Sequence, residues 1–122
     1  MKTLKELSVV YVEDEPEVRE GIARALKRRV GVLETAANGK EGLALFLQQR
    51  PDMLITDLEM PVMDGLEMVR QVRAQSPESV IIVVTAYKDE AHHTDLADGY
   101  VYKPVDIWRL VEMMEMLAQQ KR

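Results

Sequence analysis

The chain has 122 residues, of which 47% are hydrophobic and 30% charged, and its net charge is −5. This balance is typical of one globular domain over residues 1–122, and the negative charge argues against a broad nucleic-acid-binding surface. Because the chain has no cysteine, disulfides, thiolate zinc sites and thiol nucleophiles are excluded. No apolar run approaches the length of a membrane span, and no cleavage signal follows the N-terminus, so we expect a cytoplasmic protein without membrane contact.

The first half of the chain alternates between predicted strands and helices. The run "LSVVYV" (7–12) is short, apolar and β-branched, as expected of a strand buried on both faces of a parallel sheet. Pro16 suits a first helical position, and apolar residues recur at helical spacing as far as Val30. The run "VLETAA" (32–37) predicts a weaker strand, and the helix that follows it ends at Pro51.

The second half continues the alternation. The run "DMLIT" (52–56) predicts a strand that ends at Asp57, and the loop "LEMPVMDG" then leads into a helix that begins at Leu66. The run "VIIVVTA" (80–86) is the strongest strand prediction. The remaining elements are a short polar helix around 88–97, a strand at 99–102 and a last helix over roughly 105–120.

Five successive strand-helix units predict an α/β fold with a parallel sheet. Right-handed crossovers place the helices on both faces of such a sheet, which gives three layers. Ligands of these sheets bind beyond the carboxyl ends of the strands. The residues that follow each predicted strand are therefore the candidates for a functional site.

Acidic side chains follow two of the predicted strands. Glu13 and Asp14 come directly after the first strand and Asp57 after the third, so all three are expected at one edge of the sheet. Two carboxylates about 5 Å apart repel each other by roughly 3 kcal/mol at an effective dielectric constant near 20. Such a cluster either retains protons or recruits a cation, and ligands that are all oxygen favour a hard cation such as Mg²⁺.

The other groups at this edge indicate phosphoryl chemistry. Lys103 follows the fifth strand and Thr85 ends the fourth, and an ammonium and a hydroxyl both suit phosphoryl oxygens. Asp57 has the central position, and aspartate can attack phosphorus to give an acyl phosphate. Positioning and charge neutralisation would supply most of the catalysis for such a transfer.

Four stretches, in this order, resemble the receiver domains of two-component response regulators. They are "VEDE" (12–15), "LITDLEMPVMDG" (54–65), "VVTA" (83–86) and "YVYKP" (100–104), and the resemblance covers essentially the whole chain. It implies a flavodoxin-like (βα)5 fold with strand order 2-1-3-4-5. It also implies that Asp57 accepts a phosphoryl group from the phosphohistidine of a histidine kinase.

The resemblance assigns the cation ligands residue by residue. Asp14 matches the acid that coordinates Mg²⁺ directly, and Glu13 matches a neighbour that acts through water. Asp57 and the backbone carbonyl of Glu59 complete the protein ligands. Mn²⁺ is an alternative to Mg²⁺ at this site.

The resemblance also assigns the groups that respond to the phosphoryl group. Thr85 matches the switch hydroxyl, Ala86 offers its backbone N–H, and Tyr100 matches an aromatic residue that turns inward on activation. Lys103 matches the phosphoryl-binding lysine. The Lys103–Pro104 peptide bond is expected to be cis, an isomer that is inexpensive only before proline.

The implied protein is a signalling phosphoacceptor rather than a metabolic enzyme. Its expected partners are a histidine kinase or phosphotransfer domain as donor and a downstream protein or output domain, without direct nucleic-acid contact by this domain. The alternative is a receiver-like interaction module that works without phosphorylation. A hydrolase of the haloacid-dehalogenase type fits less well, because Glu59 and Pro61 depart from the positions that follow its nucleophile.

Three features depart from the family pattern. Glu59 places a carboxylate two residues after the acceptor, and Tyr87 lies two residues after Thr85, where it either shields the phosphoryl group or lies outside. Only 17 residues separate Thr85 from Lys103, about one helical turn fewer than in most members. The shortening falls in the predicted fourth helix, so signalling through the usual face is in question.

Several residues have simpler interpretations. The turn before a helix explains Asp64 and Gly65, and we expect His92 and His93 on the surface. Trp108 lies partly off the apolar stripe of the last helix together with two methionines, Met113 and Met116. It either caps the edge of the sheet, which we favour slightly, or forms a partner surface such as that of a homodimer.

Overall fold

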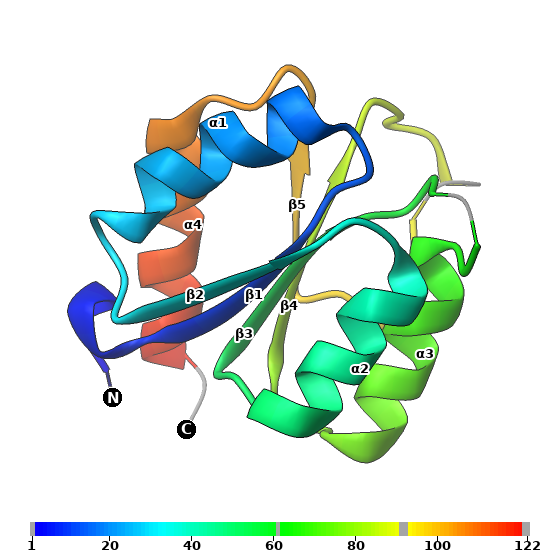
Figure 1. Cartoon of the computed structure of the whole chain (residues 1–122), viewed down its shortest axis with the longest axis horizontal. Coiled ribbons are helices and arrows are strands. Elements are labelled where there is room, and N and C mark those ends of the chain that lie inside the picture. The colour runs from blue at the N-terminus through cyan, green and yellow to red at the C-terminus, as the bar shows by residue number, and fades with distance from the viewer. Residues whose placement is uncertain (1, 61, 91–92, 121–122) are drawn as a thin grey trace.

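The computed structural model describes residues 2–60, 62–90 and 93–120 (Figure 1). The elements follow in the order η1 (Leu4–Glu6), β1 (Ser8–Val12), α1 (Pro16–Lys27), β2 (Val32–Ala36), α2 (Gly39–Gln49), β3 (Met53–Asp57), α3 (Gly65–Gln75), β4 (Val80–Thr85), β5 (Gly99–Tyr102) and α4 (Ile107–Gln120). In the described part of the chain no helix has the length and apolar character needed to cross a membrane.

The five strands form one parallel sheet in the predicted order, β2-β1-β3-β4-β5. Every neighbouring pair is parallel, and the register of the two central strands pairs Tyr11 with Ile55 and Val12 with Thr56. Strands β1, β3 and β4 are buried on both faces, as their continuous apolar sequences predict. β2 is the more exposed edge strand, which agrees with its weaker sequence pattern.

Helices cover both faces of the sheet, and each face has its own core. α1 and α4 lie on one face and α2 and α3 on the other (Figure 1). Successive residues of each strand point to opposite faces of the sheet and so contribute to different cores. Tyr11 and Ile55 belong to the core under α1 and α4, and Val12 and Leu54 belong to the core under α2 and α3. This is the three-layer α/β architecture that the sequence predicts.

Helix termini follow local sequence signals. Pro16 occupies the first turn of α1, where its missing N–H costs nothing. The side chains of Asn38 and Asp64 each accept a hydrogen bond from a backbone N–H in the first turn of the following helix, at 2.9 Å. The apolar stripe of α4 packs on the sheet through Leu110 and Met114, among other residues.

The predicted helix around 88–97 is wrong for the residues that the structure describes. Residues 86–90 and 93–98 contain no α-helix, and the next α-helix after α3 in the described residues is α4 (Ile107–Gln120). The side chain of Thr94 accepts a hydrogen bond from the backbone N–H of Leu96 at 3.2 Å, a local interaction that competes with helical bonding. Ala91 and His92 lie outside the described residues.

Arg73, near the end of α3, fastens this connection to the rest of the fold. Its guanidinium donates hydrogen bonds to the backbone oxygens of Leu96, Pro77 and Ser79 and forms an ion pair with Asp98 at 2.9 Å. The Asp98 carboxylate also accepts the N–H of Ile81 on β4 at 2.8 Å. Both charged side chains are mostly buried. One side chain therefore performs much of the tethering that a helix would otherwise provide.

We predict that Arg73→Met lowers the free energy of unfolding by roughly 3 kcal/mol, because it removes the cation that pairs with the mostly buried Asp98 carboxylate and the donor of hydrogen bonds to several carbonyls. Arg70→Met is the matched control on the same helix. Arg70 is exposed, and its ion pair with Glu67 is long, at 4.0 Å. Its loss should therefore lower the free energy of unfolding by less than about 0.5 kcal/mol. Urea unfolding of the two variants gives the comparison, and equal losses would contradict the tethering role.

Candidate functional site

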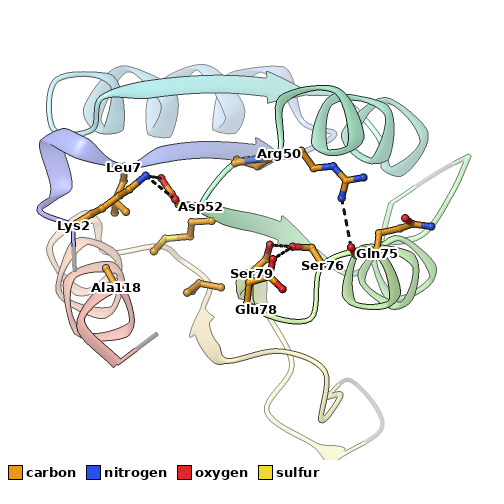
Figure 2. A pocket seen from close by; sticks show the side chains of 12 residues that line it. Lys2, Leu7, Arg50, Asp52, Gln75, Ser76, Glu78, Ser79 and Ala118 are labelled. Carbon is orange, nitrogen blue, oxygen red and sulfur yellow. Dashed lines mark hydrogen bonds and ion pairs between the residues drawn. The ribbon is translucent and has the colours of Figure 1, made fainter. Parts of the chain in front are cut away.

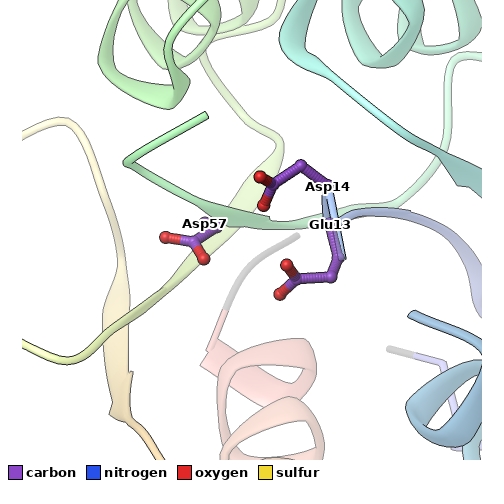
Figure 3. Close-up of side chains that lie close together, drawn as sticks. All are labelled: Glu13, Asp14 and Asp57. Carbon is purple, nitrogen blue, oxygen red and sulfur yellow. The ribbon is translucent and has the colours of Figure 1, made fainter. Parts of the chain in front are cut away.

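The candidate site lies at the edge of the sheet where the parallel strands end. Glu13 and Asp14 follow β1, Asp57 is the last residue of β3, and their carboxylate oxygens lie within 4.8 Å of one another (Figure 3). Glu13 and Asp57 are buried, whereas Asp14 is half-buried. The structure thus brings together the three acids that the sequence analysis singled out.

Lys103 is the cation that the structure places beside these acids. Its ammonium group forms an ion pair with Asp57 Oδ2 and lies 3.8 Å from Glu13 Oε1. Burial lowers the pKa of Lys103, but the hydrogen bond and charge of Asp57 and the charge of Glu13 outweigh it, so the net pKa lies above the ordinary value. The ammonium therefore stays charged throughout the physiological range.

The backbone of Lys103 is paired with the end of β4. Its N–H donates to the carbonyl of Thr85 at 2.9 Å, which continues the pairing of β4 with β5. The peptide bond to Pro104 is cis, the isomer that the resemblance implies.

Glu13 is the member of the cluster whose charged form is disfavoured by its surroundings. Its side chain is 1% exposed, and burial is the main cause that raises its pKa above the ordinary 4.5. The N–H of Glu15, which donates to Oε2 at 3.1 Å, and the charge of Lys103 act in the opposite direction, while Asp57 raises the pKa further. A bound cation would remove this penalty, and the donor set of three carboxylates fits a hard divalent ion.

Asp57 is held in place through both of its carboxylate oxygens. Oδ1 accepts the N–H of Glu59 at 3.2 Å, and Oδ2 contacts Lys103. The Glu59 side chain is exposed, and the role of its carbonyl as a cation ligand stays a prediction.

Thr85 is completely buried at the end of β4, and its hydroxyl accepts the N–H of Tyr87 at 3.2 Å. Ala86 follows at the exposed rim of the site. Tyr87 is 46% exposed, which favours a position outside the site over one that shields the phosphoryl group. The phosphoryl contacts assigned to Thr85 and Ala86 stay predictions.

Tyr100 is attached to the connection between β4 and β5. Its hydroxyl donates to the carbonyl of Thr94 at 2.7 Å and accepts the N–H of the same residue, and its ring stacks on His93 with centroids 4.1 Å apart. His93 also lies 3.0 Å from the hydroxyl of Tyr102, so its predicted surface position is wrong: the ring is half-buried between two tyrosines. The switch role of Tyr100 stays a prediction.

Trp108 is 67% exposed at the start of α4, with the guanidinium of Arg29 at 4.9 Å from its ring. Such exposure argues against the interpretation of Trp108 as a cap on the edge of the sheet. Met116 on the same helix is also exposed, whereas Met113 is half-buried.

Gly65 is a site residue that the sequence analysis treated only as part of a turn. A Cβ atom at this position would lie 2.0 Å from the backbone oxygen of Asp57 and 2.6 Å from the Cα of Leu58. The Gly65 N–H donates to the Leu58 carbonyl at 2.7 Å. The start of α3 therefore rests directly on the backbone of Asp57, a contact that only the folded chain reveals.

Two hollows in the described surface differ in their relation to this site. One of about 590 Å³ lies beside Lys103, between α1 and the segment after β5, and is lined by Val18, Ile22 and Val105 among other residues. The other, of about 370 Å³, lies at the opposite edge of the sheet, where β3 and β4 begin (Figure 2). Polar groups there bond to each other, as in the 2.6 Å contact between the Ser76 and Ser79 hydroxyls.

Comparisons with known proteins agree with this geometry. The family model of the response regulator receiver domain matches residues 9–115. The chain belongs to this family. Receiver domains are signalling domains, and this one keeps the acidic cluster at the carboxyl edge of its sheet.

The relatives and solved structures of similar sequence include response regulators. The chain is 36% identical to the probable C4-dicarboxylate response regulator DctR of Bacillus subtilis, an alignment that covers 97% of this chain and 55% of that protein. It is 31% identical to an uncharacterized 14.6 kDa protein of Leptolyngbya boryana, with 94% and 92% covered. The crystal structure of the chemotaxis response regulator CheY4 of Vibrio cholerae superimposes with a TM-score of 0.84 at 29% identity, over 92% of this chain and 98% of that one.

We predict that Gly65→Ala lowers the free energy of unfolding by roughly 2 kcal/mol or more, because the added methyl group overlaps the backbone of Asp57. Gly21→Ala on α1 is the matched control. Its Cβ meets no atom within 4 Å, so the better helix propensity of alanine should raise stability by roughly 0.5–1 kcal/mol. Urea unfolding gives both values, and losses of similar size would contradict the close contact.

Glu13→Gln should stabilise the protein in a chelating buffer at pH 7 by on the order of 1 kcal/mol, because it removes a buried charge that the fold disfavours. Because the folded-state pKa of Glu13 is raised, the parent takes up a proton on folding as the pH falls toward 4.5. The advantage of the variant should therefore shrink over that window, whereas the contribution of Lys103 changes only above its ordinary pKa of 10.5. A variant that is less stable than the parent at pH 7 would show that the charged form of Glu13 is favoured by folding.

Proposed function

We propose that this receiver domain is a phosphorylatable switch whose acceptor is Asp57. The observation that carries the proposal is the buried Asp57 at the centre of the site, with two further carboxylates within 4.8 Å and the Lys103 ammonium in an ion pair with it. In the transfer, an Asp57 carboxylate oxygen forms a bond to phosphorus as the bond between phosphorus and the donor's imidazole nitrogen breaks. The imidazole leaves with the electron pair of that bond.

The residues that would hold the cation are Glu13, Asp14 and Asp57, together with the backbone carbonyl of Glu59. Mg²⁺, with Mn²⁺ as an alternative, would neutralise the carboxylates and the phosphoryl oxygens when bound. The donor set supports this proposal, because it consists of oxygen atoms alone and its most buried member has a raised pKa. Thr85 and the N–H of Ala86 would bind the phosphoryl oxygens from the other side.

Lys103 would contribute in two ways. In the structure it forms an ion pair with Asp57 and approaches Glu13, so it balances the charge of the proposed acceptor and holds its carboxylate in place. Once the phosphoryl group is attached, the same ammonium can bind its oxygens with a small movement of a flexible side chain. Tyr100 would then respond through the bonds that tie it to the connection between β4 and β5.

The proposed donor is a histidine kinase or a phosphotransfer domain, and the proposed recipient of the signal is a downstream protein or output domain. The hollow beside Lys103 supports docking of a donor at this edge, because its lining includes apolar residues and Lys103, the ion-pair partner of Asp57. The exposed Trp108 supports a partner surface on α4, including that of a homodimer. DctR extends well beyond the region that this chain matches.

An interaction module that works without phosphorylation is the second candidate. It is favoured by one observation, the lack of an α-helix in the described residues between β4 and β5, since that helix belongs to the usual output face of the family. The acceptor, the acids and the lysine are nevertheless all present.

Intact-mass measurement after incubation with acetyl phosphate and Mg²⁺ should show the gain of one phosphoryl group. The gain should disappear in Asp57→Asn and when a chelator replaces Mg²⁺, and its rate of decay would report the effect of Glu59. A folded parent protein that gains no mass with Mg²⁺ present would favour the phosphorylation-independent module.

A further inference from the structure

A buried hydroxyl below the acid cluster has no partner. Tyr11 is 1% exposed in the middle of β1, and its hydroxyl is the one buried side-chain nitrogen or oxygen in the described part of the chain that makes no hydrogen bond. A polar atom in this position normally costs stability, because it has lost water without gaining a partner. A phenylalanine would fill the same space without this cost.

The register of the sheet places Tyr11 on the same face as two of the acids. Tyr11 lies two residues before Glu13, and its neighbour in the register, Ile55, lies two residues before Asp57. Because alternate residues of a strand share a face, Tyr11, Glu13 and Asp57 are on the same side of the sheet. Two residues of strand span roughly 6.6 Å, a distance that a phenol ring can bridge in large part.

The electrostatics agree with this placement. Burial raises the pKa of the Tyr11 hydroxyl, and the charges of Glu13 and Asp57 raise it further. The hydroxyl is therefore within electrostatic range of both carboxylates.

Glu13 is the acceptor that lacks a strong partner. Its Oε2 accepts the Glu15 N–H at 3.1 Å, and the Lys103 ammonium lies 3.8 Å from its Oε1, beyond hydrogen-bonding distance. A cation bound between the acids would draw this carboxylate toward itself and away from Lys103. The carboxylate would then need a donor from below, where Tyr11 lies.

We propose that Tyr11 is a positioning residue of the acid cluster, whose hydroxyl donates a hydrogen bond to the Glu13 carboxylate when a divalent cation occupies the site. The inference rests on the cation site of the proposed function and adds a residue to it. Tyr11 acts through Glu13 and touches neither the cation nor the phosphoryl group.

The test is Tyr11→Phe, which removes the hydroxyl and keeps the ring. Isothermal titration with Mg²⁺ alone should show a dissociation constant raised about tenfold, the effect expected of one hydrogen bond to a charged group. Urea unfolding in a chelating buffer should show a variant no less stable than the parent, because the hydroxyl has no partner there. Tyr102→Phe, which removes a hydroxyl that lies 3.0 Å from His93, should leave the Mg²⁺ affinity unchanged.

A double-mutant cycle shows whether Tyr11 acts through Glu13. In a Glu13→Gln background, Tyr11→Phe should change the Mg²⁺ dissociation constant less than twofold. A tenfold effect in that background would overturn the proposed route, and an unchanged affinity of the single variant would overturn the proposal itself.

Phosphorylation by acetyl phosphate separates this inference from the proposed function. In Tyr11→Phe the half-saturating Mg²⁺ concentration should rise about tenfold, with the maximal rate within twofold of the parent. If the parent accepts no phosphoryl group, the proposed function fails, but the Mg²⁺ titrations still decide the role of Tyr11. If the parent is phosphorylated and Tyr11→Phe has the same Mg²⁺ requirement as the parent, only the inference about Tyr11 fails.

Discussion

Mutual repulsion of carboxylates at one edge of the sheet is the constraint around which this domain is arranged. The strand order brings Glu13, Asp14 and Asp57 within 4.8 Å of one another, and burial deprives two of them of water. Lys103 compensates part of this charge by its ion pair with Asp57. The negative charge that remains uncompensated supports the proposed cation site, and the lysine supports the proposed binding of a phosphoryl group.

The site depends on its backbone support as much as on its charges. Gly65 lets the start of α3 rest on Asp57, and the pairing of Lys103 with Thr85 continues the sheet up to the site. In the described part of the connection from β4 to β5, Arg73 and Asp98 take over the tethering that a helix would give. The receiver architecture therefore tolerates the shortened connection without exposing Ile81 or Val83, which stay fully buried.

Much of the fold and most of the site could be predicted from the sequence, because they depend on local patterns. Buried β-branched runs marked the strands, and the acids at strand ends converge in any parallel sheet of this order. The failures involve contacts between distant residues. The tethering by Arg73, the half-buried place of His93 between two tyrosines, and the close approach at Gly65 each require knowledge of which segments meet in space. The helix expected around 88–97 failed because its polar residues bond locally to the backbone, as Thr94 does.

The two ends of α3 give this helix a mechanical meaning. Its first residue, Gly65, lies against the backbone of Asp57, while Arg73 in its last turn holds the segment that carries Leu96 and Asp98. An 11-residue helix is a stiff rod of roughly 16 Å. Helix α3 therefore keeps Asp57 and the connection between β4 and β5 at a fixed separation. A displacement of either contact would have to move the whole helix and so disturb the other contact.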